Sequence, residues 1–230
     1  MSRIPAFQQA LFKALRLMDA EAVTLLASGG PTGLSDYGRH ARRDLRKPQA
    51  EVEWSRRTAA LLRIAGFGVQ TEVPYPAYAV PVKRRRQRCD LVIDLGEEGK
   101  LWLEVKGAWR DYWGGNSGIY RCYLLFPLDP RFDLGKDHTV PFDLAKLNGL
   151  GQPEAQHVAE LLIGFENLND PMSEEIDTLI QLARLQEWQC GTDTWESTVV
   201  PSQRIRVFLW HRPVQSNIDG PPEPRVAAET

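Results

Sequence analysis

The chain has 230 residues, of which 43% are hydrophobic and 25% charged, an ordinary composition for a globular protein that buries a large core. No apolar run is long enough to span a bilayer and no signal-peptide pattern opens the chain, so we expect a cytoplasmic protein and no membrane contact. The three cysteines are far apart and lack companion histidines, which argues for reduced structural thiols and against a zinc finger.

The net charge of -2 hides an asymmetry along the chain. Residues 1–110 carry 19 Lys and Arg against 12 Asp and Glu, whereas residues 111–230 carry 9 against 18. One basic cluster stands directly before Asp90 and comprises Lys83, Arg84, Arg85, Arg86 and Arg88. Such side chains hold phosphates by charge and by paired hydrogen bonds. Basic runs are also common in solvated loops, so this cluster alone leaves nucleic-acid binding open.

The first elements in chain order are helical. Residues 5–27 have apolar side chains at helical spacing and end before a Gly-Gly-Pro stop, which predicts a helix or helix pair in an N-terminal extension, residues 1–48. We expect this extension to pack on the core or on a second subunit. A second helix is predicted at residues 51–65, with an apolar face centred on Trp54, and a strand follows at residues 69–73.

The next segment predicts a hairpin that carries charge. Two apolar strands, residues 89–95 and 101–106, flank a Gly-Glu-Glu-Gly-Lys turn. In the second strand Trp102, Glu104 and Lys106 share one face, and Asp90 opens the first strand at the same end of the hairpin. Buried charges cost several kcal/mol unless a metal, a partner or a substrate is near. The alternative interpretation is an ion pair on a half-exposed strand.

The remaining chain predicts further alternating elements. We expect a short helix at residues 143–150, an apolar strand at 160–165, an amphipathic helix at 173–188 and a late strand at 204–210. Residues 213–230 are polar and proline-rich, which predicts a disordered tail. Aromatic residues in the glycine-rich segment 109–123 either stack on bases or pack into the domain.

Asp90, thirteen further residues and then Glu104-Val105-Lys106 resemble the PD-(D/E)XK signature of the restriction-endonuclease-like nucleases. Cys89 stands where the motif name has proline. The order helix, three strands, helix, strand also resembles the core of that superfamily over residues 50–166. The resemblance implies an α/β fold with an αβββαβ core, in which helices flank a central mixed sheet, within a nuclease-like domain at residues 49–212.

The resemblance implies a site built on the hairpin. Asp90, Glu104 and Lys106 are the expected catalytic residues. Asp90, Glu104 and the backbone carbonyl of Val105 would hold Mg²⁺, for which Mn²⁺ would substitute. Lys106 would orient or deprotonate the attacking water and stabilise negative charge.

Further ligands are expected from other elements. Many relatives take one more carboxylate from the first core helix, which makes Glu51 the first choice and Glu53 the second, with Glu72 a third candidate. Glu51 equally fits a first-turn acid that the helix dipole stabilises. Asp94 shares a face with Asp90 but sits at the far end of its strand. The basic cluster and Lys146 are the expected contacts to nucleic acid.

Taken together, these features predict a metal-dependent nuclease that hydrolyses phosphodiester bonds, with DNA favoured over RNA. The alternative is an inactive nuclease-fold protein that binds nucleic acid or a partner. A third interpretation is a structural subunit that docks through its N-terminal helix and acidic C-terminal half. A homodimer, or a larger defence, repair or mobile-element complex, is compatible with the nuclease interpretation.

Overall fold

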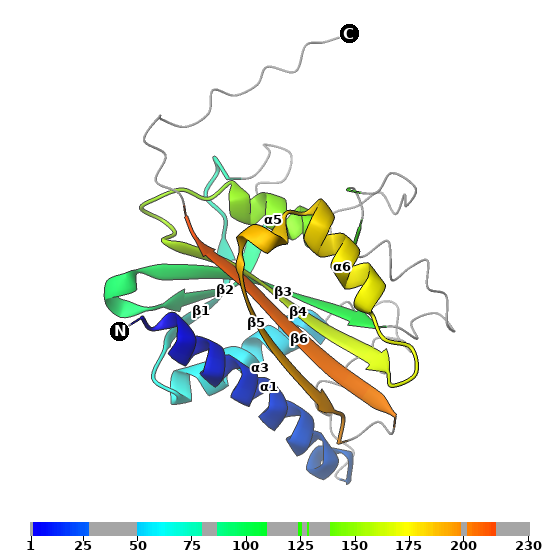
Figure 1. Cartoon of the computed structure of the whole chain (residues 1–230). Coiled ribbons are helices and arrows are strands. Elements are labelled where there is room, and N and C mark those ends of the chain that lie inside the picture. The colour runs from blue at the N-terminus through cyan, green and yellow to red at the C-terminus, as the bar shows by residue number, and fades with distance from the viewer. Residues whose placement is uncertain are drawn as a thin grey trace.

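The computed structural model of the chain describes residues 2–27, 50–79, 87–109, 124, 125, 128, 139–198 and 202–214. Within them, the side chains of residues 22–27, 50, 51 and 109 are not described. These residues form an α/β fold in which a six-stranded mixed sheet lies between two layers of helices (Figure 1). The predicted fold class is confirmed at this level.

The sheet has the strand order β1-β2-β3-β4-β6-β5. All neighbouring strands run antiparallel except β3 and β4, which are parallel. A parallel pair needs a crossover connection, and here it contains helix α5. The strands are β1 (Gly68–Pro74), β2 (Arg88–Asp94), β3 (Lys100–Trp109), β4 (His157–Asn167), β5 (Gln189–Glu196) and β6 (Gln203–Pro213).

The predicted hairpin is present as β2 and β3, joined by a short 3-10 turn at Gly96–Glu98. Its ladder runs from the pair Asp94–Lys100 to the pair Leu91–Leu103. Beyond this pair β3 continues alongside β4 as far as Trp109, while β2 leaves the ladder. The two strands therefore part at Asp90, and this fork positions the site described below.

The helices α1 (Ile4–Ala27) and α3 (Ala50–Ile64) cover one face of the sheet, and α5 (Val140–Asn148) and α6 (Ser173–Leu182) cover the other (Figure 1). Side chains of β3 alternate between the two faces, as predicted. Leu101, Leu103 and Val105 join the core under α1 and α3, whereas Trp102 joins the core on the α5 face.

Helix α1 belongs to the main core of the chain. Phe7, Leu11, Leu15 and Met18 recur at helical spacing, and all four are fully buried in one cluster with residues of α3 and the sheet. The N-terminal helix thus packs on the core of its own chain, one of the two packing partners expected for it.

Several boundaries differ from the sequence-based expectation. Helix α5 begins at Val140, ahead of the predicted residue 143, because Pro141 fits the first turn of a helix. The helix predicted at residues 173–188 was too long: α6 ends at Leu182, and Arg184 has a left-handed backbone with φ of 54°.

The C-terminal strands also differ from the expectation. Strand β5 was not predicted, because its sequence alternates polar residues along an edge of the sheet and has no apolar run. Strand β6 extends to Pro213, and the next residue, Val214, is buried. The rest of the predicted tail, residues 215–230, lies outside the described residues. Within the described part of the chain, no helix has both the length and the apolarity that a bilayer span requires.

Asp19 fastens α1 to the far end of β5. Its fully buried carboxylate accepts hydrogen bonds from the indole N–H of Trp195 at 3.1 Å, the hydroxyl of Ser197 at 3.2 Å and the backbone N–H of Thr198 at 3.1 Å. A buried carboxylate with several donors links elements that are far apart in sequence.

We predict that Asp19→Ala lowers the free energy of unfolding by about 1 to 3 kcal/mol, because these donors lose their acceptor. Asp177→Ala, at an exposed position of α6, is the matched control and should change it by less than about 0.5 kcal/mol. Urea denaturation of both variants and the wild type measures the difference. Equal stability of the two variants would contradict the role of Asp19.

Candidate functional site

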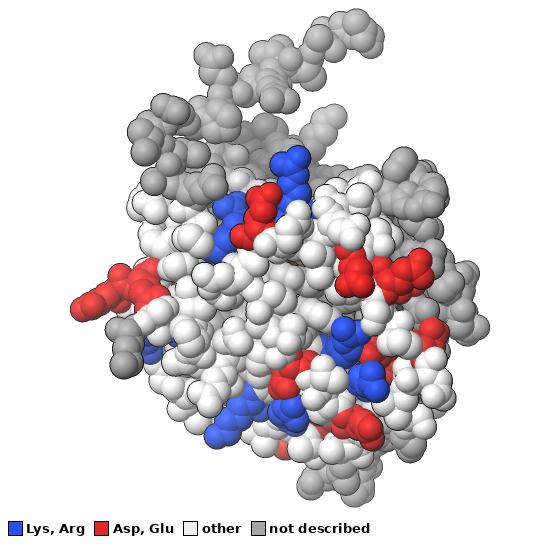
Figure 2. Space-filling model, viewed as in Figure 1, with Lys and Arg blue, Asp and Glu red and all other residues white. Residues whose placement is uncertain are grey.

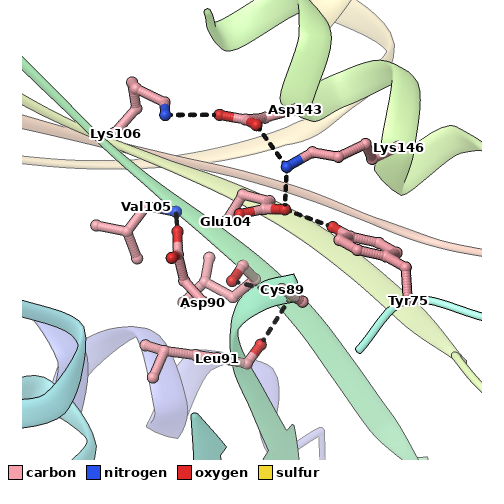
Figure 3. A network of polar contacts seen from close by, with 10 residues as sticks. Tyr75, Cys89, Asp90, Leu91, Glu104, Val105, Lys106, Asp143 and Lys146 are labelled. Carbon is pink, nitrogen blue, oxygen red and sulfur yellow. Dashed lines mark hydrogen bonds and ion pairs between the residues drawn. The ribbon is translucent and has the colours of Figure 1, made fainter. Parts of the chain in front are cut away.

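Two charged pairs meet on the α5 face of the sheet (Figure 3). Glu104 and Lys106 lie two residues apart on β3 and therefore point to the same face. Asp143 and Lys146 lie three residues apart on α5 and share one side of that helix. All four side chains are buried, with exposed fractions between 2% and 8%.

The four side chains form one chain of contacts. The Nζ of Lys106 is 3.0 Å from Oδ2 of Asp143, and Oδ1 of Asp143 is 2.7 Å from the Nζ of Lys146. Lys146 also donates to Oε1 of Glu104 at 2.6 Å. The same Oε1 accepts the hydroxyl of Tyr75, again at 2.6 Å. Lys146 thus bridges the carboxylates of the helix and the strand.

Asp90 lies at the fork between β2 and β3. Its Oδ2 accepts the backbone N–H of Val105 at 2.8 Å, a donor that the β2–β3 ladder no longer pairs. In a strand the N–H and the C=O of one residue point to the same edge, so the carbonyl of Val105 also points toward the fork. The hairpin therefore brings together Asp90, Glu104 and the Val105 carbonyl as the sequence predicted.

The carboxyl groups of Asp90 and Glu104 are close partners. Burial and the negative charge of the neighbouring Glu104 raise the pKa of Asp90 well above its ordinary value, although Lys106 and the Val105 N–H oppose this. Burial and the charge of Asp143 raise the pKa of Glu104 against the opposing effect of Lys146. A carboxyl pair of this kind favours a shared proton or a bound cation.

The neighbouring groups keep their protons. Burial alone would lower the pKa of Lys146, but Glu104 and Asp143 raise it above its ordinary value, so its ammonium stays charged. Burial first, and then nearby negative charge, raises the pKa of Tyr75, which remains a donor. Burial also raises the pKa of Cys89, whose Sγ contacts the carbonyls of Leu91 and Leu103 at 3.3 Å each. Cys89 is therefore a reduced structural residue.

Glu160 joins this group although it was not predicted. In the parallel β3–β4 ladder it is the partner of Glu104 and faces the same side. It is fully buried, and neither of its carboxylate oxygens has a hydrogen-bond partner among the described residues. Burial, followed by the charges of Asp143 and Glu104, raises its pKa well above the ordinary value.

A sequence signal for Glu160 existed. It interrupts the apolar run His-Val-Ala-Glu-Leu-Leu-Ile, just as Glu104 interrupts its own strand. Asp143 was likewise missed, although its spacing from Lys146 places both on one side of a helix. The register of β3 with β4 brings Glu160 beside Glu104, and the sequences of the two strands do not by themselves predict this register.

We call Asp90, Glu104, Asp143, Glu160, Lys106 and Lys146 the buried network, in which Asp90 is half-buried and the other five side chains are buried. Its four carboxyl groups exceed its two ammonium groups by two negative charges when all are ionised. Uncompensated buried charge is costly, so the network must either retain protons or bind positive charge.

The carboxylates of the buried network are oxygen donors of the type that a hard divalent cation prefers. Oxygen ligands suit Mg²⁺, which binds through one or two carboxylates and otherwise through water and substrate phosphates. Within the described residues no three or more His, Cys, Asp or Glu side chains are arranged to hold a metal ion. Asp90, Glu104 and the Val105 carbonyl are the candidate ligands expected from the sequence, and they would hold an ion only together with water or substrate oxygens.

Other predicted ligands lie outside the buried network. Glu53 pairs with Arg56 at 4.0 Å on the surface of α3. Asp94 is exposed and accepts the backbone N–H of Gly96 at 2.8 Å. Glu72, on β1, is half-buried, and its backbone carbonyl accepts a hydrogen bond from Arg88 at 2.7 Å.

The described residues leave part of the prediction untested. The side chain of Glu51 and the whole of Lys83, Arg84, Arg85 and Arg86 lie outside them, as do residues 110–123. Arg88 is described and exposed. On the face drawn in Figure 2, basic and acidic side chains are interspersed rather than segregated.

A separate cleft lies on the opposite face of the sheet. It has a volume of about 1030 Å³ and is lined by α1, β5 and the ends of β4 and β6, with Arg16, His157 and His211 among its residues. The guanidinium of Arg16 is already paired with Asp193, at 2.7 Å between Nε and Oδ2. Because the sheet separates this cleft from the buried network, the two do not form one site.

The chain matches no protein-family model, no curated protein and no solved structure.

The pKa direction of Glu160 gives a prediction on stability. A carboxyl whose pKa is raised by folding favours the folded state at low pH, and this contribution is lost as the pH rises through the folded-state pKa. Glutamine does not ionise, so the Glu160→Gln variant does not lose stability in this way as the pH rises. We expect the stability of the variant relative to the wild type to increase from about pH 5 to about pH 9.

Urea denaturation across this pH range measures the difference. Glu196→Gln, at an exposed position of β5, is the matched control and should give a difference that does not vary with pH. The same pH dependence in both variants would show that Glu160 carries no burial cost.

Proposed function

We propose that the chain is a metal-dependent nuclease that hydrolyses phosphodiester bonds, with DNA as the favoured substrate. The observation that carries the proposal is the pairing of the Asp90 and Glu104 carboxyls at the fork between β2 and β3, with Lys106 two residues further along β3. The order α3, β1, β2, β3, α5, β4 also agrees with the αβββαβ core of the restriction-endonuclease-like nucleases.

Asp90, Glu104 and the Val105 carbonyl are the residues that would hold Mg²⁺ or Mn²⁺. A divalent ion bound there supplies positive charge at the phosphate and activates water for attack. Hydrogen bonds within the protein orient these carboxylates before any ion binds. The Val105 N–H orients Asp90, while Tyr75 and Lys146 hold the carboxylate of Glu104.

Lys106 is suited to the charge that develops during hydrolysis. Attack on a phosphodiester increases the negative charge on its oxygens, and a preorganised ammonium stabilises such charge strongly where water is excluded. Lys106 is 6% exposed, and Asp143 holds its Nζ at 3.0 Å. In this proposal Asp143 is a positioning residue that keeps Lys106 beside Glu104.

The basic cluster supports a polyanionic substrate. Arg88 opens β2 two residues before Asp90, and four further basic residues precede it in the sequence. Positive side chains this close in sequence to a catalytic strand attract the phosphate backbone without reading its bases.

A second candidate is a nuclease-fold protein that binds nucleic acid or a partner without cutting it. One observation favours it. Oε1 of Glu104 already accepts hydrogen bonds from both Lys146 and Tyr75, which occupy the position that a metal ion would need. In this alternative Lys146 permanently replaces a metal ion as the counter-charge of Glu104.

The deciding assay incubates the protein with supercoiled plasmid, linear duplex, single-stranded DNA and RNA in Mg²⁺, Mn²⁺ or chelator. We expect cleavage only with a divalent ion. Asp90→Asn, Glu104→Gln and Lys106→Met should each reduce the rate by roughly a hundredfold or more, because each removes charge from the reacting centre. Asp94→Asn, at an exposed site on the same strand as Asp90, should retain the wild-type rate.

Circular dichroism and thermal melting of each variant separate loss of chemistry from loss of folding. Full cleavage by Asp90→Asn and Glu104→Gln at equal purity would refute the nuclease. Salt-sensitive binding of nucleic acid by the wild type, with no cleavage in any divalent ion, would support the second candidate.

A further inference from the structure

Lys146 occupies the place of a cation in the buried network. Its Nζ lies 2.6 Å from Oε1 of Glu104 and 2.7 Å from Oδ1 of Asp143, so one ammonium serves two carboxylates on different elements (Figure 3). The rings of Tyr75 and Phe142 flank it, with their centroids 5.4 and 5.8 Å from Nζ. Carboxylate oxygens and aromatic faces around a point charge form an environment that selects positive charge.

A second feature shows that Lys146 does not complete the charge balance. Glu160 is fully buried beside Glu104, and neither of its carboxylate oxygens has a hydrogen-bond partner among the described residues. Its electrostatic neighbours are Asp143, Glu104 and both lysines. The group therefore has the capacity for more positive charge than Lys106 and Lys146 supply.

We propose that Lys146 is a displaceable internal counter-ion, which neutralises Glu104 in the free protein and moves to a substrate phosphate, so that a divalent cation binds tightly only when phosphodiester is present. This inference rests on the proposed nuclease function. It assigns Lys146 a positioning and regulatory role at the same site.

The chemistry of lysine suits such an exchange. Its ammonium is a point charge on a flexible four-carbon stem, and it binds phosphate as readily as carboxylate. Lys146 lies on α5 rather than on the strand that carries Glu104, so its departure leaves the sheet intact. When it leaves, Glu104 and Glu160 lose a neighbouring positive charge, so the two carboxyls favour a divalent cation in its place.

The two binding events are then linked. If phosphodiester raises the affinity for the cation, the cation must raise the affinity for phosphodiester by the same factor. Free protein would bind Mn²⁺ weakly, because binding has to break the 2.6 Å contact between Lys146 and Glu104. The arrangement would keep the site free of metal until a substrate arrives.

The first test uses the wild type. Mn²⁺ affinity is measured from the free Mn²⁺ signal in electron paramagnetic resonance, with and without a short oligodeoxynucleotide whose phosphorothioate linkages resist cleavage. Binding of Mn²⁺ by the oligonucleotide itself is subtracted from a protein-free titration. We expect the oligonucleotide to tighten Mn²⁺ binding roughly tenfold, a typical size for coupling between sites. The absence of any coupling in the wild type overturns the proposal.

The second test removes the counter-ion. Lys146→Met keeps the length of the side chain without its charge, and it should bind Mn²⁺ roughly tenfold tighter than the wild type in the absence of oligonucleotide, with the coupling lost. Lys146→Arg retains the charge and should bind Mn²⁺ no tighter than the wild type. Lys100→Met, at an exposed position of β3, is the matched control and should behave as the wild type. Adding Glu160→Gln to Lys146→Met should weaken Mn²⁺ binding again.

Equal Mn²⁺ affinity in the wild type and a folded Lys146→Met variant would overturn the proposal, as would unchanged coupling in that variant. If Lys146→Met does not fold, the wild-type titration decides. The readout separates the two proposals. Coupled Mn²⁺ binding without cleavage would support the role of Lys146 as a displaceable counter-ion and refute the nuclease function. Cleavage without coupling would support the nuclease function and refute the role of Lys146.

Discussion

The imbalance of buried charge on the α5 face of the sheet is the constraint on which the site depends. Four carboxyl groups and two ammonium groups lie in the buried network, and Glu160 lies there without a hydrogen-bond partner among the described residues. Proteins tolerate such groups only when protons, partners or metal ions compensate them. The raised pKa values of Asp90, Glu104 and Glu160 express this constraint, since each carboxyl favours its proton in the absence of further positive charge.

The fold creates the constraint through two features of its topology. The parting of β2 from β3 at Asp90 frees the N–H of Val105, which the Asp90 carboxylate then accepts. The parallel pairing of β3 with β4 requires a crossover, and α5 within it carries Asp143 and Lys146 over the same face. An apolar layer beneath α1 and α3 fixes the opposite face of β3, so its charged residues have no alternative orientation.

The two functional candidates differ in what balances this charge. In a nuclease, Asp90 and Glu104 would hold a divalent ion, and its positive charge would add to that of the two lysines. In a binding protein, the contact between Lys146 and Glu104 is permanent, and the network serves the stability of the fold. Both interpretations use the same contact between Lys146 and Glu104 in the free protein, so they are distinguished by whether the protein cleaves phosphodiester.

Local pattern alone was enough to predict the hairpin and its residues. Alternation along a strand places Glu104 and Lys106 on one face, and the position of Asp90 at the start of the preceding strand brings it to the same end, because both are consequences of backbone geometry. Only the tertiary structure decided that Glu160 and Asp143 join them, since strand register and helix placement depend on contacts between distant segments. Burial was decided at the same level. The sequence placed Lys146 on a helix as an expected contact to nucleic acid, and the packing of α5 against β3 makes it the buried partner of Glu104.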